Sequence, residues 1–418
     1  MLKFNNKNSL VRENLFFFIA TNITNLLAFL FHFYMGRKLG PENYGILGVL
    51  LALIYFFSIT ANTIQTSIAK FISKFNIKKE YGKINFLLKS SLKRLVICGI
   101  TFNIIFIIFS SFLSDFLKIP VLPLIILSFM ITFEFLLPII RGSLQGLQKF
   151  NILGLNLILE GIIKLFFGIL LVINGLNVIG AVIAIILSYV IPFLIGNYNL
   201  RFIKKNNLIK INTKEIYNYT IPVLLMLISL TAFYSLDILL VKHFFTNKEA
   251  GYYSAAGLIG KMLFFGSLSI SQVMFAKVSG LQSDKKQHKH LLKKSLLIIF
   301  LLTIPALLIF YLFPQLIINL LFGKEFLVID KLILFSGIMM AIFSFIYLIS
   351  FYNISLHKTK FIYLLLIFNI LEIVSIYLFH DSLLQILINI IILLILLFII
   401  LLIITFKKDE TKHYNSSI

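Results

Sequence analysis

The sequence predicts an all-α polytopic membrane protein with about twelve transmembrane helices, arranged as two six-helix lobes that are related by an internal repeat. Three observations predict this fold class. The chain of 418 residues is 60% hydrophobic with a mean hydropathy of +1.00, which is more apolar surface than a soluble protein of this length can bury. Its apolar runs are roughly 20 to 30 residues long, which is enough to cross a bilayer. A tract from the first half also recurs in the second half.

The apolar runs follow one another along the whole chain. They lie near residues 12–36, 44–73, 91–114, 119–141, 151–173, 178–201, 216–242, 250–279, 293–313, 329–356, 360–379 and 382–406. The connectors between them are short, and none could fold as a soluble catalytic or nucleotide-binding domain. The sequence contains no phosphate-binding loop and no metal-ligand spacing. We therefore expect a protein that is not an enzyme and that needs no cofactor or metal.

The internal repeat pairs Gly36–Lys74 with Lys242–Gly280. The first copy ends in Gln65-Thr66-Ser67-Ile68-Ala69-Lys70 and the second in Gln272-Val273-Met274-Phe275-Ala276-Lys277. The basic linker Arg201–Lys214 has six predicted spans before it and six after it, so we expect an N-terminal lobe over 1–208 and a C-terminal lobe over 209–418. Both lobes then begin on the same side of the membrane, which predicts a parallel repeat.

The net charge of +22 at first suggests a nucleic-acid partner. The positions of the charges argue against it, because most of the 38 Lys and Arg residues lie in alternate connectors on one side of the membrane. The asymmetry predicts a multi-pass protein of the cell membrane with both termini in the cytoplasm and basic connectors against lipid headgroups. We expect no cleavable signal peptide, because the first run ends in Gly36-Arg37-Lys38-Leu39-Gly40. The lone Cys98 excludes an intrachain disulfide.

Polar side chains within the spans are the candidate functional residues, since a charge at mid-membrane costs roughly 2.5–3.5 kcal/mol. Asn22 and Asn25 lie on one stripe of the first span, which faces either a wet interior or a neighbouring helix. Asn156, Glu160 and Lys164 are spaced four residues apart, so Glu160 and Lys164 can pair on one face of the helix. That pair could be structural, or it could be part of a substrate or proton site.

The second half offers a different set of candidates. Glu372 has no lysine four residues further on, which makes it a candidate protonatable group. Asp237, which follows Tyr234 in the seventh span, is expected to face the cavity between the lobes. Lys261 in the eighth span is expected to meet an anionic substrate or an acid of another helix, such as Asp237 or Glu134. Glu372, Glu160, Glu134 and Lys164 are the candidates for coupling to H⁺ or Na⁺.

Four cations lie at predicted span ends, namely Arg37, Lys70, Arg141 and Lys277. Snorkelling to headgroups is the ordinary role of such residues. Lys70 and Lys277 occupy equivalent positions in the repeat, so the alternative is a ring of cations that attracts a phosphate-bearing substrate.

Three motifs point to a family. They are Gly36-Arg37-Lys38-Leu39-Gly40-Pro41-Glu42-Asn43-Tyr44-Gly45; Arg141-Gly142-Ser143-Leu144-Gln145-Gly146; and Asp237-Ile238-Leu239-Leu240 followed by Ala250-Gly251-Tyr252-Tyr253-Ser254-Ala255-Ala256. In order and spacing they resemble the polysaccharide-biosynthesis, or lipid-linked oligosaccharide, flippases of the multidrug/oligosaccharidyl-lipid/polysaccharide exporter (MOP) superfamily. The usual loop signature of the major facilitator superfamily is absent.

The resemblance implies a V-shaped pair of six-helix bundles that work by alternating access. It also implies a polyprenyl-(di)phosphate-linked oligosaccharide as substrate, moved from the cytoplasmic to the outer leaflet for a surface polysaccharide such as O-antigen. Glycan polymerase or assembly machinery would be the protein partner. The chain lacks the two extra helices of the lipid II flippases, so a surface glycan is favoured over a peptidoglycan precursor.

Three other functions stay open at the level of sequence. An ion-coupled multidrug exporter of the same superfamily would be expected to have acids in its cavity, whereas this chain adds Lys164 and Lys261. A membrane-embedded glycan polymerase or glycosyltransferase commonly has a large external loop or an Asp-x-Asp site, and neither is present. A scramblase-like or purely structural membrane protein is the remaining reading.

Overall fold

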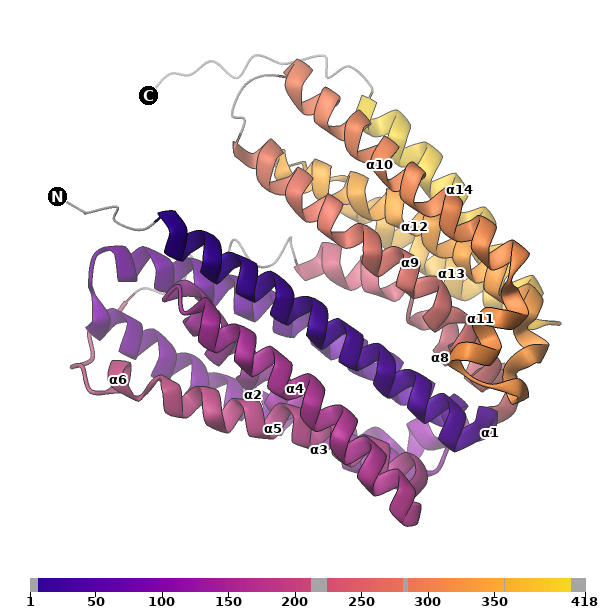
Figure 1. Ribbon diagram of the computed structural model, residues 1–418, viewed down its shortest axis with the longest axis horizontal. Helices are drawn as coiled ribbons and strands as arrows, with labels where there is room; N and C mark the ends of the chain where they lie inside the picture. The colour runs from indigo at the N-terminus through magenta and orange to yellow at the C-terminus, as the bar shows by residue number, and fades with distance from the viewer. Residues whose placement is uncertain (1–6, 212–223, 281–284, 357, 407–418) are drawn as a thin grey trace. The chain divides into compact units, whose positions relative to one another are not determined.

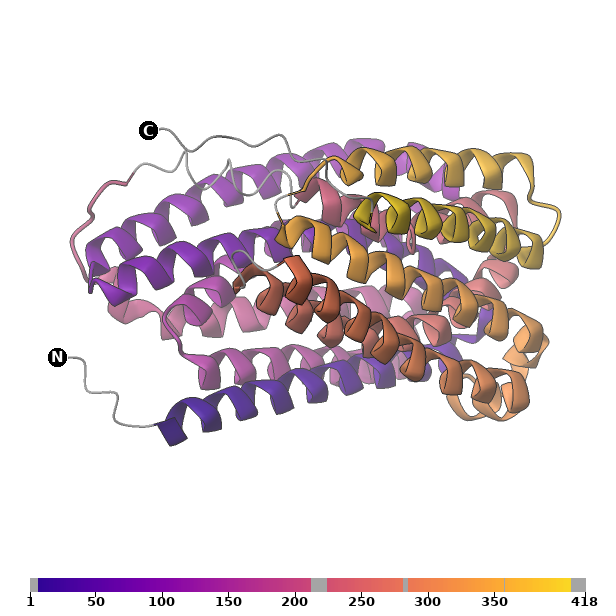
Figure 2. The same ribbon diagram turned by 90° about the horizontal axis from the view of Figure 1, so that it is seen from above.

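The computed structural model describes residues 7–211, 224–280, 285–356 and 358–406, and these ranges contain helices and turns with no β-strand (Figures 1 and 2). The first half holds α1 (Lys7–Ile77), α2 (Tyr81–Leu117), α3 (Val121–Gly146), α4 (Phe150–Leu171), the π-helical turn η1 (Val172–Leu176), α5 (Asn177–Asn199) and α6 (Arg201–Lys204). A helical stretch at 224–232 precedes α8 (Leu236–Phe244), α9 (Asn247–Gly280), α10 (Lys285–Leu312), α11 (Pro314–Leu321), the 3₁₀ turn η2 (Lys324–Ile329), α12 (Asp330–Ser355), α13 (Phe361–Leu378) and α14 (Leu383–Phe406).

The helices confirm the predicted fold class. Within the described ranges, ten helical stretches are long and apolar enough to cross a membrane, and two of them each contain two predicted spans. The stretch Ile19–Ile77 runs through a kink at Gly40, whose φ of 69° and ψ of 174° are not helical. The stretch Phe150–Asn199 runs through Gly175, with φ 86°. The chain is thus a multi-pass membrane protein with the expected succession of spans.

The chain divides into two compact units. The first comprises Met1–Ala255 together with Gln315–Ile329, and the second comprises Ala256–Pro314 together with Asp330–Ile418. In the first unit α1 packs against α3 and α4, α2 against α3, and α4 against α5. In the second unit α12 packs against α10 and α14, and α13 against α14. The lobe boundary between residues 208 and 209 stays a prediction.

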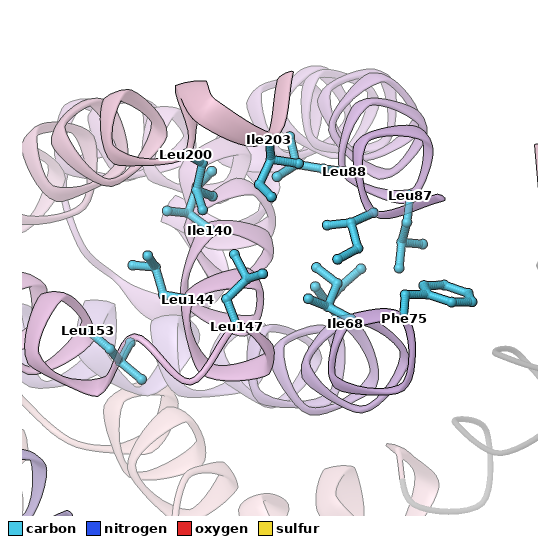
Figure 3. Packing of buried hydrophobic residues seen from close by; sticks show 12 residues of the cluster. Ile68, Phe75, Leu87, Leu88, Ile140, Leu144, Leu147, Leu153, Leu200 and Ile203 are labelled. Atoms are coloured by element: carbon cyan, nitrogen blue, oxygen red, sulfur yellow. The ribbon is translucent and has the colours of Figure 1, made fainter. Parts of the chain in front are cut away.

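The core of the first unit includes a cluster where α1 ends, α2 begins, α3 ends and α4 begins (Figure 3). Its buried members are Ile68, Ile72, Phe75, Ile84, Leu87, Leu88, Ile140, Leu144, Leu147, Leu153, Leu200 and Ile203. The close approach of α3 to α1 is possible because Gly142 and Gly146 have no side chain; a Cβ there would lie 2.6 and 2.7 Å from backbone oxygens of Gln65 and Ala69. The motif that begins at Arg141 therefore has a packing role.

The segment Gln315–Ile329 belongs to the first unit although its neighbours in sequence, α10 and α12, belong to the second. The sequence predicted only a connector here, and the structure forms α11 and η2. Phe322 and Phe326 are fully buried and pack edge-on against Tyr44, with ring centroids 5.5 and 6.1 Å apart. Arg37 donates to the backbone oxygen of Asn319 at 2.9 Å. We call Gln315–Ile329 the docked segment.

Candidate functional site

A buried polar cluster joins α3, α4 and α5 inside the first unit. Arg141 on α3 pairs with Glu160 on α4, with 2.7 Å between Nη2 and Oε2. Its Nε also donates to Oδ1 of Asn156 at 2.9 Å. Arg141 is only 9% exposed, so the interpretation that it snorkels to headgroups is wrong. The reason is a carboxylate and an amide on the facing helix, which supply hydrogen-bond acceptors to the buried, planar guanidinium.

Glu160 has a closer partner than the one that spacing along α4 suggests, although Lys164 still interacts electrostatically with it. Glu160 forms its ion pair with Arg141, and the paired atoms lie 2.7 Å apart. Spacing along α4 favours Lys164 as the partner, but the planar guanidinium of Arg141 on α3 offers the carboxylate a more directional donor. The Lys164 ammonium instead lies 5.5 Å from the centroid of the Phe31 ring, at the distance of a cation–π contact.

Asn156 extends the cluster to α5. Its Nδ2 donates to the backbone oxygen of Pro192 at 2.7 Å while its Oδ1 accepts from Arg141. One side chain therefore bridges three helices. Such a bridge fixes their spacing, because its donor and its acceptor would both be costly to leave unsatisfied away from water.

Glu134 adds a second carboxyl to the same region. It precedes Arg141 by two helical turns on α3, is only 2% exposed, and hydrogen-bonds to the Tyr189 side chain of α5. Within the described residues its Oε2 has no hydrogen-bond partner. Lys164 interacts electrostatically with both Glu134 and Glu160. The cluster thus holds two acids, Glu134 and Glu160, and two cations, Arg141 and Lys164; Glu134 is the acid that could take up a proton. Sequence reasoning missed Tyr189, because a lone tyrosine in an apolar span gives no signal of its partner.

Asp237 lies in a second polar site of the first unit. It is buried at the start of α8, where the helix resumes after a break at residues 233–235. Its Oδ1 accepts from the Ile238 backbone N–H at 2.8 Å, and its Oδ2 accepts from the Tyr253 hydroxyl at 2.8 Å. Tyr234 is half-buried, hydrogen-bonds Thr231 at 3.2 Å and packs against Tyr55. The role of Asp237 and Tyr234 in a cavity stays a prediction.

The remaining candidates lie apart along the chain. Asn22 and Asn25 are exposed on α1, and Lys70 and Lys277 are exposed towards the ends of α1 and α9. Arg37 is exposed, and its contacts with Asn319 and Leu320 satisfy carbonyls at the end of α11. Lys261 is partly exposed on α9, and Glu372 is buried on α13. In the described part of the chain, no group of three or more His, Cys, Asp or Glu side chains could hold a metal ion.

The fold is shared with solved transporter structures. A multidrug resistance MATE family transporter of the MOP superfamily, in an inward-facing conformation, superposes with a TM-score of 0.76 at 17% identity, covering 91% of this chain and 93% of that one. A MOP superfamily transporter from Pyrococcus furiosus gives 0.70 at 16% identity, with 95% and 94% covered. A eukaryotic MATE transporter gives 0.67 at 14% identity, with 96% and 97% covered. The chain therefore has the two-lobed fold of the MOP superfamily.

Residues 34–331 match the family described as polysaccharide biosynthesis protein, and the chain belongs to that family. An uncharacterized membrane protein from Methanocaldococcus jannaschii is 24% identical over 290 residues, which cover 65% of this chain and 68% of that protein. The family expected from the sequence motifs is thereby confirmed.

Proposed function

We propose that this protein is a flippase that moves polyprenyl-(di)phosphate-linked oligosaccharide from the cytoplasmic to the outer leaflet by alternating access. The observation that carries the proposal is membership of the polysaccharide biosynthesis family in a chain with the MOP fold. A polysaccharide built outside the cell needs its precursor to cross the membrane, and a protein of this fold is suited to that step. The protein acts in the cell membrane with both termini in the cytoplasm, beside glycan polymerase or assembly machinery.

Charge supports an anionic substrate. Lys70 and Lys277 are exposed at equivalent positions of the repeat. The Pyrococcus furiosus transporter is described as having a binding pocket of reverse polarity that suggests a different function. A cationic lining in this chain, with Lys261 and these two lysines as its candidates, would suit a phosphate or diphosphate headgroup.

The energy source that we propose is an ion gradient. The Glu134 carboxyl lies beside the Arg141–Glu160 ion pair and Lys164. These neighbouring charges can compensate Glu134 in both its protonated and its ionised form. A proton is a better match than Na⁺, because the two cations of the cluster would repel a bound metal ion. Glu372, buried on α13, is the candidate for the same task in the second unit.

A multidrug exporter is the second candidate, favoured by the likeness to MATE family structures. One experiment separates the two. Purified protein in proteoliposomes is tested for flipping of a fluorescent polyprenyl-diphosphate oligosaccharide and, in the same preparation, for ethidium efflux. We expect glycolipid flipping without drug efflux. Drug efflux without flipping would move the protein to the multidrug branch, and neither activity would reopen the enzymatic and structural readings.

A further inference from the structure

Helix α9 passes from one compact unit of the protein to the other. Residues up to Ala255 belong to the first unit, and residues from Ala256 to Pro314 belong to the second. The helix is nevertheless continuous from Asn247 to Gly280. If the two units move relative to one another, as the proposed function requires, the change of angle has to be absorbed within α9 or at the other two unit boundaries, 314/315 and 329/330.

Each side of the boundary within α9 is held by its own unit. On the first side, the Tyr253 hydroxyl donates to Asp237, and a Cβ on Gly251 would lie only 1.8 Å from the backbone oxygen of Pro41. On the second side, the Ser336 hydroxyl of α12 donates to the backbone oxygen of Ala256 at 2.9 Å. The two anchored parts of α9 are thus separated by about one helical turn.

Gly257 lies at this boundary without a packing reason to be glycine. Among the described residues, no heavy atom lies within 4 Å of the position that its Cβ would take. Glycine in a helix interior is less stable than alanine, and nothing in the packing compensates for that loss here. Gly260, one turn later, is different, because a Cβ there would lie 2.4 Å from Oγ of Ser336.

The hydrogen bond from Ser336 makes the same turn of helix easier to deform. A side-chain donor to the Ala256 carbonyl shares an oxygen that otherwise serves only the backbone ladder of α9. Inserted donors of this kind, like glycines, are recognised causes of helix bending. The glycine and the serine belong to different helices, so the two observations are independent.

We propose that Gly257 is a hinge at which α9 bends when the two units change their relative orientation. The inference rests on the proposed function for its purpose, since alternating access is what requires the motion, but its test does not need a substrate. Gly266 supplies a matched control. It lies in the same helix, a Cβ on it would also meet no described atom within 4 Å, and it belongs wholly to the second unit.

The experiment measures distances between spin labels by pulsed electron paramagnetic resonance in liposomes. Labels are placed at the exposed positions Lys89→Cys on α2 and Lys293→Cys on α10, in a Cys98→Ser background. We expect two distance populations in the parent protein, and Gly257→Ala should reduce the minor one by about fivefold, the factor expected from helix propensity. Gly266→Ala should leave both unchanged. The thermal midpoint of Gly257→Ala should be equal to or above that of the parent, which excludes misfolding.

Three outcomes would overturn the hinge. They are a single distance population in the parent, an equal shift by both glycine variants, and unchanged distances in Gly257→Ala. If the distances are unchanged and the KM for glycolipid is raised, the open space beside Gly257 accommodates substrate instead. If Gly257→Ala shifts the distances but the protein flips no glycolipid, the hinge stands and the proposed substrate fails.

Discussion

Gly45 and Gly251 each lie against the backbone oxygen of the residue four positions before the other. A Cβ on Gly45 would lie 2.0 Å from the oxygen of Asn247, and a Cβ on Gly251 would lie 1.8 Å from the oxygen of Pro41. The two glycines come from the two copies of the internal repeat, so the contact is a reciprocal crossing of duplicated helices. The close crossing therefore explains why the family motifs have glycine at positions 45 and 251.

The crossing predicts that alanine is poorly tolerated at either glycine. Gly45→Ala and Gly251→Ala should each destabilise the protein by about 3 kcal/mol, the upper end of the cost of overpacking, because backbone rather than a flexible side chain has to give way. The measurement is thermal unfolding in detergent. Gly266→Ala is the control with open space, and an equal loss of stability in all three variants would contradict the interpretation.

The ion pair between Arg141 and Glu160 predicts a second pattern of stability. Arg141→Gln or Glu160→Gln alone should cost about 3 kcal/mol, because each leaves a buried charge without its partner. The double variant should cost clearly less than the two single costs added together. The same unfolding assay measures this cycle, with Lys83→Gln, which breaks the partly exposed Lys83–Glu80 pair, as a control expected to cost under about 1 kcal/mol. Strict additivity would mean that the pair contributes little.

Glu134→Gln tests ion coupling. Glutamine keeps the size of the side chain and its hydrogen bond to Tyr189 but cannot exchange a proton. We expect a folded protein whose glycolipid flipping no longer responds to an imposed pH gradient, while substrate-driven flipping persists. Tyr189→Phe is the matched control, since it removes the hydrogen bond and leaves the carboxyl. A full response to the gradient in Glu134→Gln would assign coupling to another residue, with Glu372 tested next.

The contact between Asp237 and Tyr253 predicts a coupled loss of stability. Removing the partner of a buried hydrogen-bonding group costs about 1–3 kcal/mol, so Tyr253→Phe should cost about 2 kcal/mol. Asp237→Asn should cost a similar amount, and the double variant should show coupling in the unfolding assay. If Asp237→Asn also leaves flipping intact, its proposed role in a substrate cavity fails and only the structural role remains.

Lys261 is predicted to contact the substrate headgroup. Lys261→Ala should lower flipping at least tenfold, while Lys261→Arg, which keeps the charge, should retain a substantial part of the activity. Flipping of the fluorescent glycolipid in proteoliposomes measures both. Lys89→Ala, at an exposed lysine on α2, is the control for the general loss of a positive charge. Normal flipping by both Lys261 variants would exclude a substrate contact.

The sequence was sufficient for the spans and for the family but insufficient for the partners of individual side chains. Spans are set by length and hydropathy, which are properties of a local stretch, and the described helices agree with them. Arg141 was expected at a headgroup because it ends an apolar run, yet its environment depends on which face of α4 lies opposite. Spacing along one helix likewise favoured Lys164 for Glu160, since it cannot account for a competing residue on another helix.

The docked segment shows the same limit. Its residues are mostly apolar but too few to span a membrane, and the burial of Phe322 depends on the rings of Tyr44 and Phe33 far away in the sequence. Tyr189 gave no signal because its only distinguishing feature, the contact with Glu134, is tertiary. A local stretch of sequence is therefore enough to predict a helix. It is not enough to predict which residues form the polar cluster.

The docked segment also has a consequence for dividing the protein into two fragments. Phe322 and Phe326 come from the second half of the chain yet complete the aromatic packing around the kink of α1. If the polypeptide were cut at its midpoint, the first fragment would expose the apolar surface around Tyr44. The second fragment would expose Phe322 and Phe326, because the rings that they pack against would be missing. We therefore expect that the two halves of the chain cannot be produced separately as fully packed modules.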